Sequence, residues 1–185
     1  RQHSSNVMSD RLRGVAVVAH GGGPTQVINS SLAGVIDECR RHGEITALYG
    51  ARHGIIGVLE ENFLDLSVQE AELVSALGRT TGSALGSCRR KVSSADYERI
   101  LAVFKAHNVR YFFYNGGNDS MDTAYHVSQL ARDSGHEMRV MGIPKTIDND
   151  LAGTDHCPGY GSAARFIAHA LRDIGGDNRA LPTPV

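Results

Sequence analysis

The sequence has few cysteines, and their pattern excludes two kinds of covalent or metal support. Its 185 residues contain three, Cys39, Cys88 and Cys157, and no two of them form a C-x-x-C pair. An odd number without such a pair argues against a disulfide framework and against a zinc knuckle. We therefore expect a reducing, cytoplasmic setting.

Long hydrophobic runs and an excess of charge are also missing. No apolar run approaches the roughly 18 residues that a membrane-spanning helix needs, and the opening RQHSSNVMSDRLRG lacks the apolar centre of a signal peptide. The formal net charge is −1, and the scattered Lys and Arg residues form no basic stripe for a nucleic-acid backbone. These absences predict a soluble protein with neither a membrane nor a nucleic acid as partner.

The length and the 41% hydrophobic content are typical of one sizeable globular domain or of part of a larger one. Residues 1–13 are polar and without periodicity, so we predict a loose leader before a domain at residues 14–185. The chain begins with Arg1 rather than Met and stops at LPTPV, where an apolar strand could begin. We therefore expect a fragment of a longer protein.

Short apolar runs alternate with helical patterns along the chain. Strands are predicted at residues 14–20, 44–51, 109–115 and 138–143, and helices at residues 28–39, 68–78, 93–104, 120–132 and 162–174. Ser93 and Asp96 form a capping-box pattern, and residues 52–67 are predicted as a loop. This alternation predicts an α/β fold with a parallel sheet and helices on both faces, a three-layer, Rossmann-like arrangement.

Ligands of such sheets bind at the carboxyl ends of the strands, where three loops of this chain should meet. The loops are GGGPTQ, NGGNDS and PKTIDND. A glycine triplet alone is more often a tight turn that binds nothing. Two glycine turns ahead of helix N-termini, at one sheet edge, are better explained together by an extended polyphosphate that binds their N–H groups.

The third loop places Lys145, Asp148 and Asp150 within six residues. These charges could belong to a solvated loop. They could equally form a site in which one carboxylate accepts a proton while Lys145 stabilises negative charge on phosphorus.

Other polar residues leave similar alternatives open. Asn118 and Asp119 stand at a predicted helix N-cap, where the carboxylate would either cap the helix or hold a metal. Arg89 and Arg90 are either solvated or form a phosphate clamp.

Common nucleotide and metal motifs do not account for these loops. There is no G-x-x-x-x-G-K-[ST] sequence, and GYGSAA follows DHCP rather than an apolar strand, which disfavours NAD. DNDLAG departs from an EF-hand loop. The nine histidines show no H-x-x-x-H spacing, so we predict ordinary surface or capping residues.

Residues 14–185 resemble the phosphofructokinases, most closely their diphosphate-dependent branch. The likeness rests on GGGPTQVIN, YGARHGIIGVL, TGSALGSCRR, GGNDSMDTA, and PKTIDNDL followed by TDHCPGYGSAA. It implies the donor-binding domain of a longer, two-domain homo-oligomer, either a dimer or a tetramer. It also implies Mg²⁺-dependent, reversible transfer of a phosphoryl group from diphosphate to the C1 hydroxyl of fructose 6-phosphate, a step of glycolysis.

The resemblance also implies roles for individual residues. Asp148 would be the base that takes the hydroxyl proton, and Thr146 and Asp150 would help to place the sugar phosphate and the reacting groups. Gly22 would offer its backbone N–H to the donor phosphates, and Arg89 would contact them.

The remaining implied roles concern the donor and the metal. Gly117, Asn118 and Asp119 would lie beside both, with Asn118 and Asp119 as candidate Mg²⁺ ligands. ATP-using relatives have glycine at the positions of Asp119 and Lys145, so here the room for a nucleotide would be filled. The carboxylate of Asp119 would repel an α-phosphate, and Lys145 would stabilise charge on the transferring diphosphate.

Two alternatives stay open: an ATP-dependent phosphofructokinase, and a truncated, non-catalytic phosphate-binding module. The second is considered because the family's M-G-R segment and later sugar-phosphate ligands are not in this sequence. The direction of flux and the use of sedoheptulose 7-phosphate are left undetermined.

Overall fold

The valine-rich run at residues 14–20 forms the central strand of a five-stranded sheet, β1 (Gly14–His20). The computed structural model describes residues 12–25 and 27–183, so most of the predicted leader lies outside the described residues. Both neighbours of β1, β2 (Ile45–Ala51) and β4 (Val109–Gly116), are parallel to it, and β5 (Arg139–Pro144) is parallel to β4. These four strands confirm the predicted ones to within a residue or so at each end.

One edge of the sheet departs from the prediction of a parallel sheet. β3 (Phe63–Asp65) pairs antiparallel with β2, and the strand order is β3-β2-β1-β4-β5. A short helix, α2 (Ile55–Leu59), precedes it, so the prediction of a loop at residues 52–67 was wrong. Both elements are shorter than the window over which hydrophobic periodicity becomes detectable.

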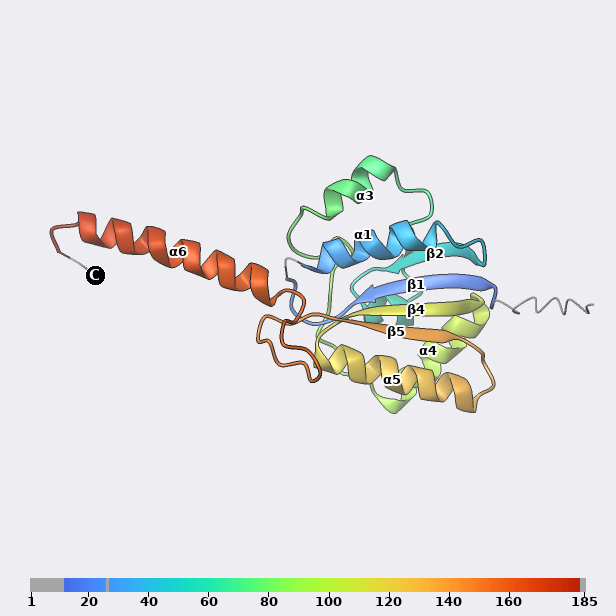
Figure 1. Cartoon of the computed structure of the whole chain (residues 1–185). Helices are drawn as coiled ribbons and strands as arrows, with labels where there is room; N and C mark the ends of the chain where they lie inside the picture. Colours follow the sequence, from blue (N-terminus) through green and yellow to red (C-terminus); the bar gives the residue numbers. More distant parts are fainter. Residues whose placement is uncertain (1–11, 26, 184–185) are drawn as a thin grey trace, which may run out of the picture.

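Helices cover both faces of the sheet, as predicted (Figure 1). α1 (Val27–Cys39) and α3 (Ala71–Leu77) lie on one face, and α2, α4 (Ser94–Ala106) and α5 (Asn118–Asp133) lie on the other. The side chains of β1 alternate between the two cores. Ala16 and Val18 pack in the cluster with α1, while Val17 and Ala19 pack in the cluster with α4 and α5. A strand buried on both sides in this way needs the continuous apolar run that the sequence has.

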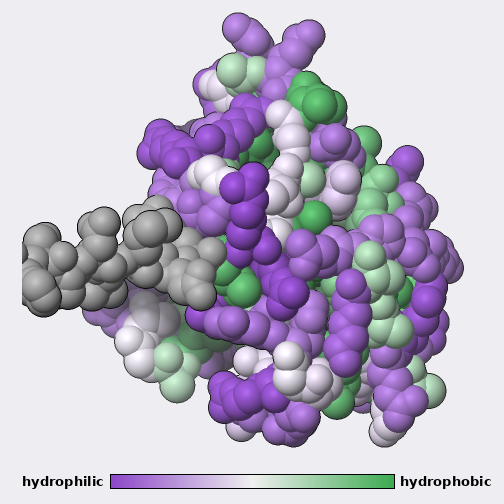
Figure 2. All heavy atoms as spheres, turned by 90° about the vertical axis from the view of Figure 1, so that its right-hand side faces the viewer, coloured by the Kyte–Doolittle hydropathy of each residue, from purple (hydrophilic) through white to green (hydrophobic). Residues whose placement is uncertain are grey.

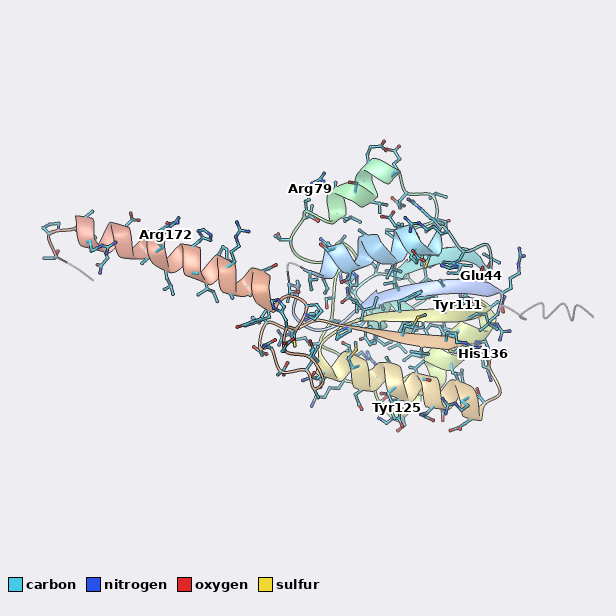
Figure 3. The ribbon with its side chains drawn as sticks, viewed as in Figure 1. Glu44, Arg79, Tyr111, Tyr125, His136 and Arg172 are labelled. Carbon is cyan, nitrogen blue, oxygen red and sulfur yellow. The ribbon has the colours of Figure 1, made fainter. Side chains whose placement is uncertain are left out.

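The last helix, α6 (Tyr160–Ala180), extends away from the sheet, and none of its residues is buried (Figures 1 and 3). It confirms the predicted helix and is longer at both ends. The predicted apolar side is solvent-exposed, with Phe166 at 68% and Leu171 at 65%. Among the described residues, no helix combines the length and the apolarity that crossing a bilayer requires.

The two ends of the parallel strands differ in character. Figure 2 shows the face at their amino ends, where hydrophilic residues predominate and hydrophobic ones are scattered. Glu44, Tyr111 and His136 lie toward this end (Figure 3). The three loops predicted to carry the site lie at the opposite, carboxyl end.

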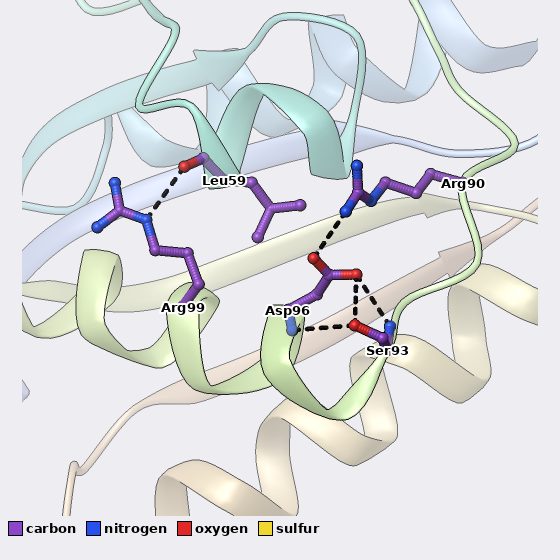
Figure 4. Close-up of polar contacts among 5 residues, drawn as sticks. All are labelled: Leu59, Arg90, Ser93, Asp96 and Arg99. Atoms are coloured by element: carbon purple, nitrogen blue, oxygen red, sulfur yellow. Dashed lines mark hydrogen bonds and ion pairs between the residues drawn. The ribbon is translucent and has the colours of Figure 1, made fainter.

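α4 begins with the predicted capping box (Figure 4). The Ser93 hydroxyl accepts the N–H of Asp96 at 3.3 Å, and the Asp96 carboxylate accepts the N–H of Ser93 at 3.0 Å.

Ser93→Ala should lower the free energy of unfolding by about 1 kcal/mol, because a helix N–H loses its partner. Ser94→Ala is the matched control and should change it by less than about 0.5 kcal/mol. Urea unfolding of both variants measures this, and equal effects would contradict it.

Candidate active site

The carboxyl ends of three parallel strands meet at one edge of the sheet. His20 lies opposite Asn115 and Gly116 lies opposite Pro144, so β1, β4 and β5 end side by side. The segments that follow them, together with the segment around Arg89, line a cleft of about 840 Å³. The structure brings all the predicted site residues to this cleft: Gly22, Arg89, Gly117, Asn118, Asp119, Lys145, Thr146, Asp148 and Asp150.

Lys145 connects the loop after β5 to the loop after β1. Its side chain is buried, and the ammonium donates a hydrogen bond to the carbonyl oxygen of Gly23. Its backbone N–H donates to the Gly116 carbonyl at 3.0 Å. Burial lowers the pKa of Lys145 and the positive charge of Arg89 lowers it further, while Asp148 opposes both. An ammonium has three N–H donors, so those that Gly23 leaves free are available to an anion in the cleft.

Gly22 lines the cleft, but its amide is already in use. Its φ of +76° is a left-handed conformation that favours glycine, and a Cβ there would be in van der Waals contact with the Lys145 ammonium nitrogen, at 3.4 Å. The N–H of Gly22 donates to the carbonyl of Cys88 at 3.0 Å. The structure therefore does not support the predicted donation from this amide to a phosphate. The neighbouring N–H of Gly23 has no partner among the described residues.

The second glycine loop leads directly into α5. Gly117 is the N-cap and no side chain caps the helix, so the interpretation of Asp119 as a capping carboxylate was wrong. Asn118 and Asp119 instead occupy the first turn, where unpaired N–H groups and a partial positive charge favour an anion. The Asn118 amide donates to the Asp150 carboxylate at 3.2 Å, which connects the second loop to the third.

The third loop exposes its two carboxylates to the cleft. Asp148 and Asp150 are both exposed and both line it. The N–H of Asp148 donates to the Thr146 hydroxyl at 3.0 Å, and the N–H of Thr146 donates to the Pro158 carbonyl at 2.9 Å. The backbone that carries Asp148 is thus fixed while its carboxylate stays accessible.

The two arginines both line the cleft but have different neighbours. Arg90 makes an ion pair with Asp96 at 2.8 Å, at the start of α4 (Figure 4). Arg89 lies beside the first glycine loop, since a Cβ on Gly23 would be 3.1 Å from its guanidinium. Arg89 therefore stands with Lys145 at the loop after β1.

The cleft carries oxygen atoms of the kind that Mg²⁺ prefers. Within residues 12–25 and 27–183, no three His, Cys, Asp or Glu side chains form a group that could enclose a metal. The cleft does offer oxygens from Asn118, Asp119 and Asp122. Mg²⁺ prefers oxygen ligands and is usually held by one or two carboxylates together with substrate phosphates.

Some cleft residues were missed by the sequence analysis. Asp122 and Thr123 follow Asp119 by three and four positions on α5, so helical spacing could have indicated them. Lys91 continues the basic run of GSCRRK. Tyr97 comes from the first turn of α4, and no local signal indicates it.

The prediction of ordinary surface or capping histidines was wrong for His20. It is fully buried at the end of β1, with Nδ1 2.7 Å from the Ser83 hydroxyl. That hydroxyl donates its hydrogen to the Gly86 carbonyl at 2.8 Å, so the imidazole must be the donor to Ser83. Burial lowers the pKa of His20 to about 4. A neutral imidazole therefore fixes the segment that leads to Arg89.

Comparison with known proteins gives consistent matches. The phosphofructokinase family model matches residues 15–181. A pyrophosphate–fructose 6-phosphate 1-phosphotransferase of Xanthomonas campestris is 50% identical over 173 residues, which are 91% of this chain and 41% of that protein. The enzyme of that name from Rhodospirillum rubrum is 47% identical, over 92% of this chain and 42% of that protein.

A solved structure agrees with these relatives. The crystal structure of a pyrophosphate-dependent phosphofructokinase from Marinobacter aquaeolei superposes with a TM-score of 0.85 at 48% identity, covering 90% of this chain and 42% of that one. The chain thus spans about two fifths of the length of the proteins it matches.

The neutral state of buried His20 makes stability depend on pH. Its pKa is about 4 in the folded protein against 6.5 for the free side chain, so the unfolded chain binds the proton first as the pH falls. The free energy of unfolding should therefore decrease by roughly 3 kcal/mol from pH 6.5 to pH 4 through this group alone. Above pH 6.5 the contribution is complete.

Urea unfolding across this pH range, with His20→Gln, measures the effect. The glutamine variant should lose much of the pH dependence. His126→Gln, on the exposed surface of α5, is the control and should keep it. An identical pH profile for His20→Gln and the unmodified protein would contradict the assignment.

Proposed function

The chain belongs to the phosphofructokinase family, and we propose that it forms the phosphoryl-donor-binding domain of a longer, two-domain diphosphate-dependent enzyme. The reaction moves a phosphoryl group from diphosphate to the C1 hydroxyl of fructose 6-phosphate. Relatives with nearly half of their aligned residues identical are named for this activity. The remaining sugar-phosphate ligands come from outside these residues.

A pair of neighbouring cations carries the proposal. Lys145 is buried with its pKa lowered by burial and then by Arg89, so two positive charges stand close together where one of them is poorly solvated. Such an arrangement is costly in the empty protein and is relieved by an anion between the two groups. Diphosphate supplies several negative charges in a small volume.

Diphosphate binds along the wall that the first two loops share. The ammonium of Lys145 and the guanidinium of Arg89 contact its oxygens, and guanidinium matches phosphate geometry in a bidentate way. The free N–H groups in the first turn of α5 add donors and a favourable dipole. When bound, Mg²⁺ neutralises phosphate charge, and Asn118 and Asp119 would hold it.

The chemical step uses the third loop. Asp148 accepts the proton of the C1 hydroxyl as the oxygen forms its bond to phosphorus and the bond between phosphorus and the bridging oxygen of diphosphate breaks. The released phosphate keeps the electron pair of that bond and stays paired with Arg89. Lys145 stabilises the charge on the transferring group, and such electrostatic stabilisation is usually the largest contribution to phosphoryl transfer. Thr146 and Asp150 orient the sugar.

ATP is disfavoured as the donor by two side chains. The Asp119 carboxylate and the Lys145 side chain line the cleft. The family resemblance implies glycine at both positions in the ATP-using relatives. A nucleotide would bring its α-phosphate toward Asp119, and like charges in a shielded site repel by several kcal/mol. The homo-oligomer, the magnesium requirement and the cytoplasmic setting are part of the same proposal and rest on the family resemblance.

Removing the proposed base should separate turnover from binding. In the full-length enzyme, Asp148→Asn should lower kcat by about 10²- to 10⁴-fold, because the hydroxyl proton loses its acceptor. Diphosphate should still raise the thermal midpoint of the variant as it does for the unmodified enzyme. Asp133→Asn, at the far end of α5, is the matched control with normal turnover. Near-normal kcat in Asp148→Asn refutes the base assignment.

Donor choice provides a second test. The unmodified enzyme should use diphosphate in preference to ATP when both are assayed side by side. The double variant Asp119→Gly/Lys145→Gly should shift the ratio of kcat/KM values toward ATP by about 10-fold or more, since relief of 1.4 kcal/mol is a factor of about ten. Asp119→Asn keeps the volume and removes the charge, so it measures repulsion alone. An unmodified enzyme that prefers ATP would overturn this account of donor selection.

A further inference from the structure

The loop that carries Asp148 and Asp150 leaves the sheet and returns beside its own start. Thr146 and Gly159 form a parallel bridge, and the N–H of Thr146 donates to the Pro158 carbonyl at 2.9 Å. Gly159 has a φ of +98°, and a Cβ there would lie 3.3 Å from the Thr146 carbonyl oxygen. The two ends of the loop are therefore fixed, and its middle needs support of its own.

Asn149 supplies that support from between the two aspartates. Its side-chain oxygen accepts the N–H of Cys157 at 2.9 Å, and its side-chain nitrogen donates to the Asp155 carbonyl at 3.2 Å. Cys157 is fully buried, so the outgoing half of the loop is attached to a well-packed point of the returning half. The amide group thus uses both of its ends, the oxygen as an acceptor and the nitrogen as a donor.

The backbone of Asn149 contributes as well. Its φ of 56° is left-handed, a conformation that side chains other than glycine seldom adopt and that asparagine tolerates better than most. The amide of Asn149 faces the returning half of the loop, while the residues on both sides of it, Asp148 and Asp150, line the cleft. The reversal at one residue is what allows two acidic neighbours to serve the same cleft.

We propose that Asn149 is a positioning residue of the phosphoryl transfer, whose left-handed backbone and two hydrogen bonds hold Asp148 and Asp150 toward the cleft. This inference rests on the proposed function, because Asn149 acts through Asp148 and Asp150. A general base works only from hydrogen-bonding distance of the proton it takes. A displacement of about 1 Å at a reacting group costs up to about 100-fold in rate.

The chain offers a matched control for this residue. Asn108 is also left-handed, with a φ of 50°, and its side chain also makes a local hydrogen bond, to Arg110 at 2.9 Å. It precedes β4 and therefore lies at the amino end of the sheet, away from the cleft. Glycine at either position keeps the left-handed backbone and removes only the side-chain bonds.

The experiment compares Asn149→Gly with Asn108→Gly in the full-length enzyme, using diphosphate, Mg²⁺ and fructose 6-phosphate. Asn149→Gly should lower kcat by roughly 10- to 100-fold and leave the KM for diphosphate nearly unchanged. It should lower Tm by only about 2 to 4 °C more than Asn108→Gly does, because it removes two hydrogen bonds rather than one. Asn108→Gly should keep normal kcat. The split between kcat and KM distinguishes positioning from a general loss of structure.

Three outcomes decide between the possibilities. Equal kcat values in the two glycine variants overturn the positioning role. A loss of kcat in Asn149→Gly that merely follows a collapse of Tm also overturns it, because the role is then structural. An unmodified enzyme that transfers no phosphoryl group from diphosphate contradicts the proposed function, which is a separate failure.

Discussion

The hydrogen bond from the Lys145 ammonium to the Gly23 carbonyl connects the two loops on which the donor site depends. It crosses from the loop after β5 to the loop after β1, two strands that β4 separates. A buried ammonium is costly to desolvate unless it is hydrogen-bonded. Gly22 lies beside this lysine with a φ of +76°, a left-handed backbone conformation that favours glycine. The parallel register, which ends all three strands at one edge, makes so short a bridge possible.

The same constraint determines the charge pattern of the cleft. Burial and the nearby Arg89 lower the pKa of Lys145, while Asp148 favours the charged lysine. Positive charge therefore gathers at the loop after β1, where Lys145 and Arg89 stand, while Asp148 and Asp150 carry negative charge on the loop that follows β5. A small polyanion is bound by cations and N–H donors, whereas a reacting hydroxyl group requires a carboxylate base. The topology of the sheet thus brings cationic groups and carboxylates into one cleft.

The sequence predicted those parts of the molecule that depend on local pattern. The run at residues 14–20 is long and apolar enough to identify β1, and Ser93 with Asp96 identifies the start of α4. α2 and β3 were not predicted because they are too short to show a hydrophobic periodicity. The antiparallel pairing of β3 is set by its contacts with β2 rather than by its own residues. The spacing of apolar residues predicted the apolar side of α6, but it did not predict that this side is solvent-exposed.

The site shows the same division. Most of its residues could be named because they follow strands whose ends must meet, whereas Arg89 was named from a basic run and the family resemblance. All of them line the cleft. The sequence pattern could not predict the partners of individual groups. The Gly22 amide donates to the Cys88 carbonyl, Arg90 pairs with Asp96, and His20 is buried against Ser83. Those partners are distant in sequence, and only the folded chain brings them together.

The most direct measurement is a crystal structure of the full-length enzyme with Mg²⁺ and diphosphate. The account predicts diphosphate oxygens within hydrogen-bonding distance of both the Lys145 ammonium and the Arg89 guanidinium, beside the first turn of α5. Diphosphate bound elsewhere, with Lys145 still directed only at the Gly23 carbonyl, would contradict it.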